Sequence, residues 1–195
     1  MPVMPLGAFG KYDKAHFRLG GDPGTLHAAA ARWRSFGEAA LDAAAKMRAI
    51  NDGGFIGTEG DRFRELVNAD FPKNLTTTGD SHVGVADAIS HYATALADFK
   101  FEMGLTRISA RRHCAEVNTA AAEVNAAELA AAGTGGAASP ELAIALAKYN
   151  TAKAAWDADI AAANRIKDSL GGEVRTQAAA IAQETKERFE ENPNR

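Results

Sequence analysis

Apolar residues recur every three or four positions on both sides of a glycine-rich turn, and this pattern constrains the fold more than any other feature of the chain. The turn reads Asn51-Asp52-Gly53-Gly54-Phe55-Ile56-Gly57. Such spacing places the apolar side chains on one face of a helix, so the sequence predicts two antiparallel helices joined at residues 51–57. The predicted seam of the first helix comprises Leu26, Ala29, Trp33, Phe36, Ala40, Ala43, Met47 and Ile50.

The first helix has a clear expected start, and the segment after the turn has an expected interruption. Asp22 suits the N-cap position, and Pro23 suits the first helical position, where no N–H donor is needed. After the turn, a short helix is expected over 58–70, with Phe63 on its apolar side. Pro72 is expected to interrupt or kink the path, and the threonine-rich residues 74–81 are expected to bend or fray.

Helical periodicity returns at His82 and predicts one helix of about 50 residues, a length of roughly 75 Å. A glycine- and alanine-rich turn follows over 132–139. Ser139 and Pro140 then fit the cap and first position of a last helix, which Gly171-Gly172 should kink or loosen. The predicted fold class is all-α, as elongated antiparallel helical hairpins or a helical bundle that share one long central helix.

This pattern divides the chain into an irregular N-terminal arm over 1–21, a first hairpin over 22–104 and a second hairpin over 105–195. Folding the chain at its two turns also predicts which residues face each other. The pairs expected in the first hairpin are Met47 with Leu66, Phe36 with Leu75, and Leu26 with Val85. The pairs expected in the second are Tyr149 with Val124, Trp156 with Val117, and Leu170 with Met103.

Composition and charge argue against several partner classes. The 195 residues carry a net charge of −3 with no basic block, so nucleic acid is not an expected partner. No segment has the apolar length of a signal peptide or a membrane span, which favours a cytoplasmic protein unless a leaderless exporter recognises its folded shape. The one cysteine, Cys114, has no intramolecular disulfide partner and is expected to be buried.

Motifs for chemistry are weak. The five histidines (His16, His27, His82, His91 and His113) are scattered without metal-ligand spacing, and each is expected at the surface or in a seam. The glycine-rich residues 20–24 lack the lysine of a phosphate loop, and their pattern predicts a turn followed by a helix cap. A Ser-His-Asp group could still converge from distant positions. Arg107, Arg111 and Arg112 are expected on a solvated face. No cofactor or metal is expected, and neither is catalysis.

The aromatic residues Trp33, Phe36, Tyr92 and Phe99 allow two interpretations. They can form an intramolecular core between the helices, or part of the stripe can seal against a partner. A two-helix hairpin leaves one side of its stripe uncovered, and contiguous exposed apolar surface marks binding sites. The second hairpin could also cover that side. Tyr149 and Trp156, seven residues apart, are expected in a seam.

Several stretches together resemble a known family. They are Gly21-Asp22-Pro23, Ala31-Arg32-Trp33 within an amphipathic helix, the aromatic turn with its glycine, Phe63 to Leu66, and Tyr92 to Leu96. In these the chain resembles the Trp-x-Gly (WXG) superfamily of actinobacterial type VII secretion substrates over roughly residues 20–100. It is most similar to the N-terminal secretion domains of polymorphic toxins exported by that route. The second hairpin resembles the helical stalk that such domains carry.

The resemblance implies a hairpin that pairs with a small WXG-like helical protein and is recognised by the secretion ATPase, without a stable membrane insertion. It implies a chain that folds in the bacterial cytoplasm and is then secreted or displayed at the cell surface. The residues it assigns to partner or secretion recognition are Phe55, Ile56, Gly57, Trp33, Phe36 and Phe63.

The sequence departs from the family at two points. Phe55 stands where the family has tryptophan, so the ring lacks an N–H donor. The family's tail signal, tyrosine followed four residues later by an acidic residue, is absent, so a partner is expected to supply it. Two other functions stay open: a self-assembling secreted helical protein that forms a homo-oligomer, and a small-ligand binder or enzyme, which would need a concave pocket.

Overall fold

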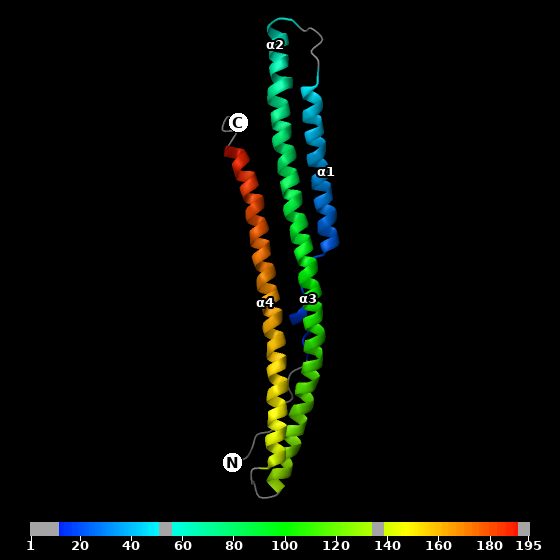
Figure 1. Ribbon diagram of the computed structural model, residues 1–195, viewed down its shortest axis with the longest axis vertical. Coiled ribbons are helices and arrows are strands. Elements are labelled where there is room, and N and C mark those ends of the chain that lie inside the picture. Colours follow the sequence, from blue (N-terminus) through cyan, green and yellow to red (C-terminus); the bar gives the residue numbers. More distant parts are fainter. Residues whose placement is uncertain (1–11, 51–55, 134–138, 191–195) are drawn as a thin grey trace. The chain divides into compact units, whose positions relative to one another are not determined.

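The computed structural model describes residues 12–50, 56–133 and 139–190, and within them the protein is helical with no strand (Figure 1). The predicted all-α class is therefore confirmed. The described helices are the 3-10 helix η1 (Lys14–Phe17), α1 (Pro23–Arg48), α2 (Thr58–Glu65), the π-helical turn η2 (Leu66–Asp70), α3 (Phe71–Gly133) and α4 (Pro140–Glu190).

The helix starts are those that the sequence predicts. The Asp22 carboxylate accepts hydrogen bonds from the backbone N–H groups of Gly24 (3.3 Å) and Thr25 (3.0 Å), which lack partners within the helix. Gly21 precedes this cap at a φ of 81°, a conformation that favours glycine. The Ser139 hydroxyl accepts from the N–H of Leu142 at the start of α4 (3.4 Å). The glycine-rich residues 20–24 thus form a turn and a cap, as predicted.

Pro72 does not end the helix, because α2, η2 and α3 form one continuous helix of 76 residues, but the regular α-helical hydrogen bonding gives way to a π-helical turn just before it. Proline in a helix lacks a donor, and its ring collides with the carbonyl four residues earlier. The π-helical turn lies immediately before Pro72, where the N–H of Phe71 bonds the carbonyl of Leu66, five residues back. This wider turn gives the ring room, and Pro72 is fully buried. The expected fraying over 74–81 is also absent.

The chain forms two compact units, and the long helix contributes to both. One unit comprises Met1–Gly20 with Asp98–Leu170, and the other comprises Gly21–Ala97 with Gly171–Arg195. The helix α4 is unbroken through Gly171 and Gly172, so the kink expected there is not present as a break in the helix.

In the unit Gly21–Ala97, α1 runs antiparallel to the first part of α3, as the hairpin prediction requires (Figure 1). The closest approach lies at Gly37 of α1 and Gly79 of α3. A Cβ atom on Gly37 would lie 2.6 Å from the carbonyl oxygen of Gly79, so only glycine fits there. Alanine occupies the neighbouring turns at intervals of seven residues. The small residues buried in this seam are Ala30, Gly37 and Ala44 on α1 and Gly79, Ala86 and Ala93 on α3.

The predicted aromatic seam of α1 is therefore wrong by one position. Gly37, rather than Phe36, faces α3, and the large rings lie beside the contact instead of within it. The register also differs, because Phe36 contacts the ring of His82 rather than Leu75. The displacement is about five to seven residues, or roughly 8–10 Å along the axis. The glycine contact favours this register, because a Cβ atom on either glycine would lie within 3 Å of the carbonyl oxygen of the other.

In the unit Asp98–Leu170, the predicted register holds to within one or two residues. Lys148 of α4 contacts Glu123 of α3 (3.0 Å), and Asp159 contacts His113 (2.7 Å). These pairs fit the expected opposition of Tyr149 with Val124 and of Trp156 with Val117. The buried core of the unit comprises Phe17, Met103, Ala110, Ala163 and Ile166. Cys114, on α3, is also buried, as predicted.

The described part of the N-terminal arm is irregular except for one turn of helix that the sequence does not predict. Residues Lys14–Phe17 form a 3-10 helix, capped by the Asp13 carboxylate at the N–H of Ala15 (2.8 Å). Phe17 is only 2% exposed and packs edge-on against Trp156 of α4, with ring centroids 6.0 Å apart. One turn of helix is too short to show a period, so the sequence pattern gives no sign of this docking.

Candidate functional site

The strongest candidate site is a group of three aromatic rings on the unit Gly21–Ala97, in which Trp33 and Phe36 both contact His82; it is here called the aromatic patch. Trp33 of α1 stacks on His82 of α3 with centroids 4.9 Å apart and planes 28° apart. Phe36 lies on the same imidazole at 4.5 Å and 43°. The side chains of Trp33 and Phe36 remain 43% and 56% exposed. The patch is therefore an ordered apolar surface that the hairpin itself does not cover.

The seam of small residues places the patch. Because Gly37 and Gly79 bring α1 and α3 so close, there is no room for an indole or a phenyl ring between the helices. Trp33 and Phe36 lie to the side, where the imidazole of His82 separates them. The Nδ1–H of His82 donates to the carbonyl of Thr78 (2.8 Å), which fixes the ring plane. The patch thus has its shape before any partner arrives.

Polar contacts beside the patch belong to the same two helices. Arg34 forms an ion pair with Asp87 across the hairpin, and His27 lies 3.5 Å from the hydroxyl of Ser90. Both members of the ion pair are about half exposed, so the pair contributes little to stability. Aromatic side chains with polar groups around them are typical of the centre of a protein–protein interface.

Trp33 and Phe36 are predicted from the sequence as recognition residues, whereas His82 is not. His82 is one of five scattered histidines, and the register predicted from the apolar pattern pairs Phe36 with Leu75 instead. The register could have been predicted from the small residues that recur every seven positions on both helices, since aligning these two series places Gly37 opposite Gly79. From that register, His82 falls beside both rings.

The expected tip of the hairpin is a separate surface. Phe55 lies outside the described residues. Ile56 is 92% exposed, and Gly57 adopts a φ of 99° with open space around the position of a Cβ. The Gly57 carbonyl accepts the N–H of Asp61 (2.9 Å), which begins α2. Phe63 is 43% exposed.

The tip and the aromatic patch are not brought together. From Phe36 to the end of α1 at Arg48 the helix rises about 18 Å. Among the described residues that the resemblance assigns to recognition, Trp33 and Phe36 therefore do not lie with Ile56 and Gly57. Trp33 and Phe36 belong to the patch, whereas Ile56 and Gly57 belong to the connection beyond the end of α1.

The other unit brings a serine, a histidine and an aspartate together without the geometry of a catalytic triad. Nδ1 of His113 lies 2.7 Å from Oδ2 of the buried Asp159, and the Ser109 hydroxyl lies 3.5 Å from the same nitrogen. In a triad the serine and the aspartate contact opposite nitrogens of the imidazole. Here Nη2 of Arg112 donates to the opposite nitrogen, Nε2 (3.1 Å). The cluster joins α3 to α4 rather than activating a nucleophile.

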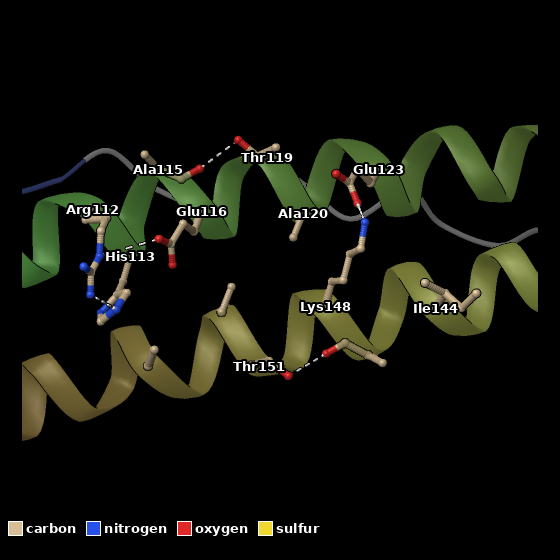
Figure 2. A pocket seen from close by; sticks show the side chains of 13 residues that line it. Arg112, His113, Ala115, Glu116, Thr119, Ala120, Glu123, Ile144, Lys148 and Thr151 are labelled. Atoms are coloured by element: carbon tan, nitrogen blue, oxygen red, sulfur yellow. Dashed lines mark hydrogen bonds and ion pairs between the residues drawn. The ribbon is translucent and has the colours of Figure 1, made fainter.

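An open groove of about 940 Å³ lies along the same pair of helices. Figure 2 shows Ala120 on α3 projecting toward α4, and the Lys148–Glu123 ion pair across the gap. Most of the lining is methyl groups of alanine and threonine, and the polar groups along the groove pair with one another. Across the part of the chain that the structure describes, no three histidine, cysteine or acidic side chains are grouped to hold a metal ion.

Two further findings concern membrane insertion and similarity to known proteins. None of the helices over 12–50, 56–133 and 139–190 has a run of apolar residues long enough to span a bilayer. Searches against protein-family models, curated proteins and solved structures each find no match for this chain.

Proposed function

We propose that the chain is a non-catalytic adaptor for leaderless, type VII-like secretion, which pairs with a small helical protein through its first hairpin. The observation that carries the proposal is the aromatic patch of Trp33, Phe36 and His82. It is ordered, about half exposed, and supported by a rigid pair of helices. Large aromatic side chains at such a place are the residues that dominate binding energy in protein interfaces.

The shape of the partner follows from the shape of the patch. Two rings on adjacent turns of α1, at positions 33 and 36, leave a shallow apolar strip parallel to the helix axis. A helix of the partner with apolar residues three and four apart can lie along such a strip. The WXG-like stretches at 21–23, 31–33 and 92–96 lie on the same two helices, which is why the proposed partner is a small helical protein of that kind.

The connection beyond α1 has a second proposed role, in contact with the secretion ATPase. Ile56 is almost fully exposed, and Gly57 has space around it. An export machine that reads a folded substrate without a leader needs such a protruding feature. The proposal includes that the chain is exported, that it carries a toxin as cargo, and that it comes from an actinobacterium.

The test uses the full chain co-expressed with the proteins that the neighbouring open reading frames encode, followed by affinity capture and mass measurement of the complex. The variant Trp33→Ala/Phe36→Ala is expected to lose capture by about tenfold or more, since each buried aromatic contributes about 1–2 kcal/mol or more to such contacts. Leu129→Ala, at an exposed leucine of the other unit, is the control and should bind normally.

A second arm separates pairing from export. In a host that carries the secretion ATPase, Ile56→Asp should reduce the amount of chain in the culture medium while leaving capture of the partner unchanged. Unaltered capture by the Trp33→Ala/Phe36→Ala variant, with helicity intact by circular dichroism, would contradict the proposed role of the patch.

A further inference from the structure

A second exposed apolar surface lies on α3 in the unit Asp98–Leu170, far along the helix from the patch. Phe101, Leu105 and Ile108 are spaced by four and three residues and are 71%, 54% and 66% exposed. At 100° per residue they lie about 170° around the helix from the buried Met103 and Ala110. This stripe therefore faces away from the core of its own unit.

The stripe is nearly symmetric about Leu105. Phe101 lies four positions before the centre and Ile108 three positions after it. The exposed Asp98 lies seven positions before the centre, and the exposed Arg112 seven positions after it. All five residues lie on one face of the helix. If a second copy of this face is placed on the first by a two-fold rotation about Leu105, apolar side chains oppose apolar side chains, and each Asp98 opposes an Arg112.

We propose that a second copy of this chain docks on the stripe, with the two α3 helices antiparallel around a two-fold axis at Leu105. In this arrangement Leu105 packs against the Leu105 of the second copy. Phe101 covers the second copy's Ile108, and the reverse contact follows by symmetry. Asp98 faces the second copy's Arg112, so the interface contains two ion pairs.

The charge pattern favours a copy of the chain over an unrelated helix. An isologous contact requires a surface that is complementary to itself, and the order Asp98, Phe101, Leu105, Ile108, Arg112 has that property. Arg112 forms an exposed pair with Glu116 of its own helix (3.6 Å) and also contacts Nε2 of His113 (3.1 Å). Asp98 of the second copy therefore competes with both contacts, of which the exposed ion pair contributes little to stability.

The area of the stripe sets the strength of the association. At these exposures the three apolar side chains present roughly 350 Å² per copy, the size of the largest patch on an ordinary monomer. Stable interfaces bury about 800 Å² per partner. The dimer is therefore weak, with a Kd on the order of 100 µM. It involves a different unit from the aromatic patch and does not depend on the proposed secretion role.

The experiment is sedimentation equilibrium of the full chain from about 10 µM to about 500 µM, a range that brackets the expected Kd. Wild type should shift from monomer toward dimer. Leu105→Glu places two like charges at the axis and should stay monomeric. Leu129→Glu, the same change at a 78% exposed leucine of the same helix, is the control and should behave as wild type.

Charge exchange tests the proposed pairing itself. Asp98→Arg and Arg112→Asp should each weaken the dimer by about threefold to tenfold, because each puts like charges opposite one another twice. The double variant Asp98→Arg/Arg112→Asp should return to within about twofold of wild type. A wild type that is monomeric at every concentration, a Leu105→Glu variant that still dimerises, or a double variant that stays as weak as the single ones would each overturn the proposal.

Discussion

Replacing Gly37 with alanine tests whether backbone contact holds the first hairpin together. On an exposed helix this change is stabilising by about 1 kcal/mol, since glycine is a poor helix former. At Gly37 the new Cβ would lie 2.6 Å from the carbonyl oxygen of Gly79 and 2.9 Å from a methyl group of Val83. The nearest obstacle is backbone, so it cannot be relieved by a change of rotamer.

The expected change in the free energy of unfolding is the balance between the gain in helix propensity and the cost of the new steric contact. Overfilling a tight contact costs about 1–3 kcal/mol, because helices must separate or side chains leave their preferred rotamers. After the gain in helix propensity, Gly37→Ala should be destabilising by about 1–2 kcal/mol. Gly104→Ala is the matched control, since no atom lies within 4 Å of its Cβ position, and it should be stabilising by about 1 kcal/mol.

The assay is urea unfolding of both variants, followed by circular dichroism and by the fluorescence of Trp33 in a Trp156→Phe background. Trp33 lies on the hairpin that the glycine contact holds together, so its signal reports on that unit. Opposite signs for the two substitutions support close backbone contact at Gly37. A Gly37→Ala variant that is stabilised as much as Gly104→Ala would refute the reasoning.

Three further outcomes concern the other unit. Phe17→Ala should lower the free energy of unfolding by about 3–4 kcal/mol in a urea titration, because a 2% exposed phenyl ring is removed from contact with Trp156. Burial raises the pKa of Tyr12 above its ordinary 10.0, against the opposing effect of nearby arginines, so the unfolded chain loses that proton first as pH rises. Stability should therefore fall as pH rises through 10, and thermal melts of Tyr12→Phe should show a smaller fall over the same range. Asp159→Ala removes the acceptor of His113 in a nearly buried place and should cost about 1–3 kcal/mol by urea unfolding.

The sequence predicts the second hairpin better than the first, and packing explains the difference. In the second hairpin medium-sized side chains such as Val117 and Met103 fill the seam, so the apolar period coincides with the buried face. In the first hairpin the buried face is alanine and glycine, and the largest apolar residues lie beside it. A search for large apolar side chains therefore selects Phe36 where Gly37 is the contact.

Two other features could not be read from periodicity. Pro72 is accommodated by a π-helical turn, a local change in hydrogen bonding that the residue pattern over 66–70 does not reveal. The docking of Phe17 depends on contacts with a helix more than a hundred residues away in the chain. For the candidate site, sequence supplied two of the three rings, and only the observed register adds His82.

The exposure of Trp33 before and after partner binding tests the central claim most directly. In the Trp156→Phe background, iodide should quench the Trp33 fluorescence of the free chain efficiently, because the indole is 43% exposed. Addition of the small helical partner should then protect it, with emission shifted to shorter wavelength. An indole that is already shielded from iodide in the free chain, or one that stays equally quenchable in the complex, would contradict the account.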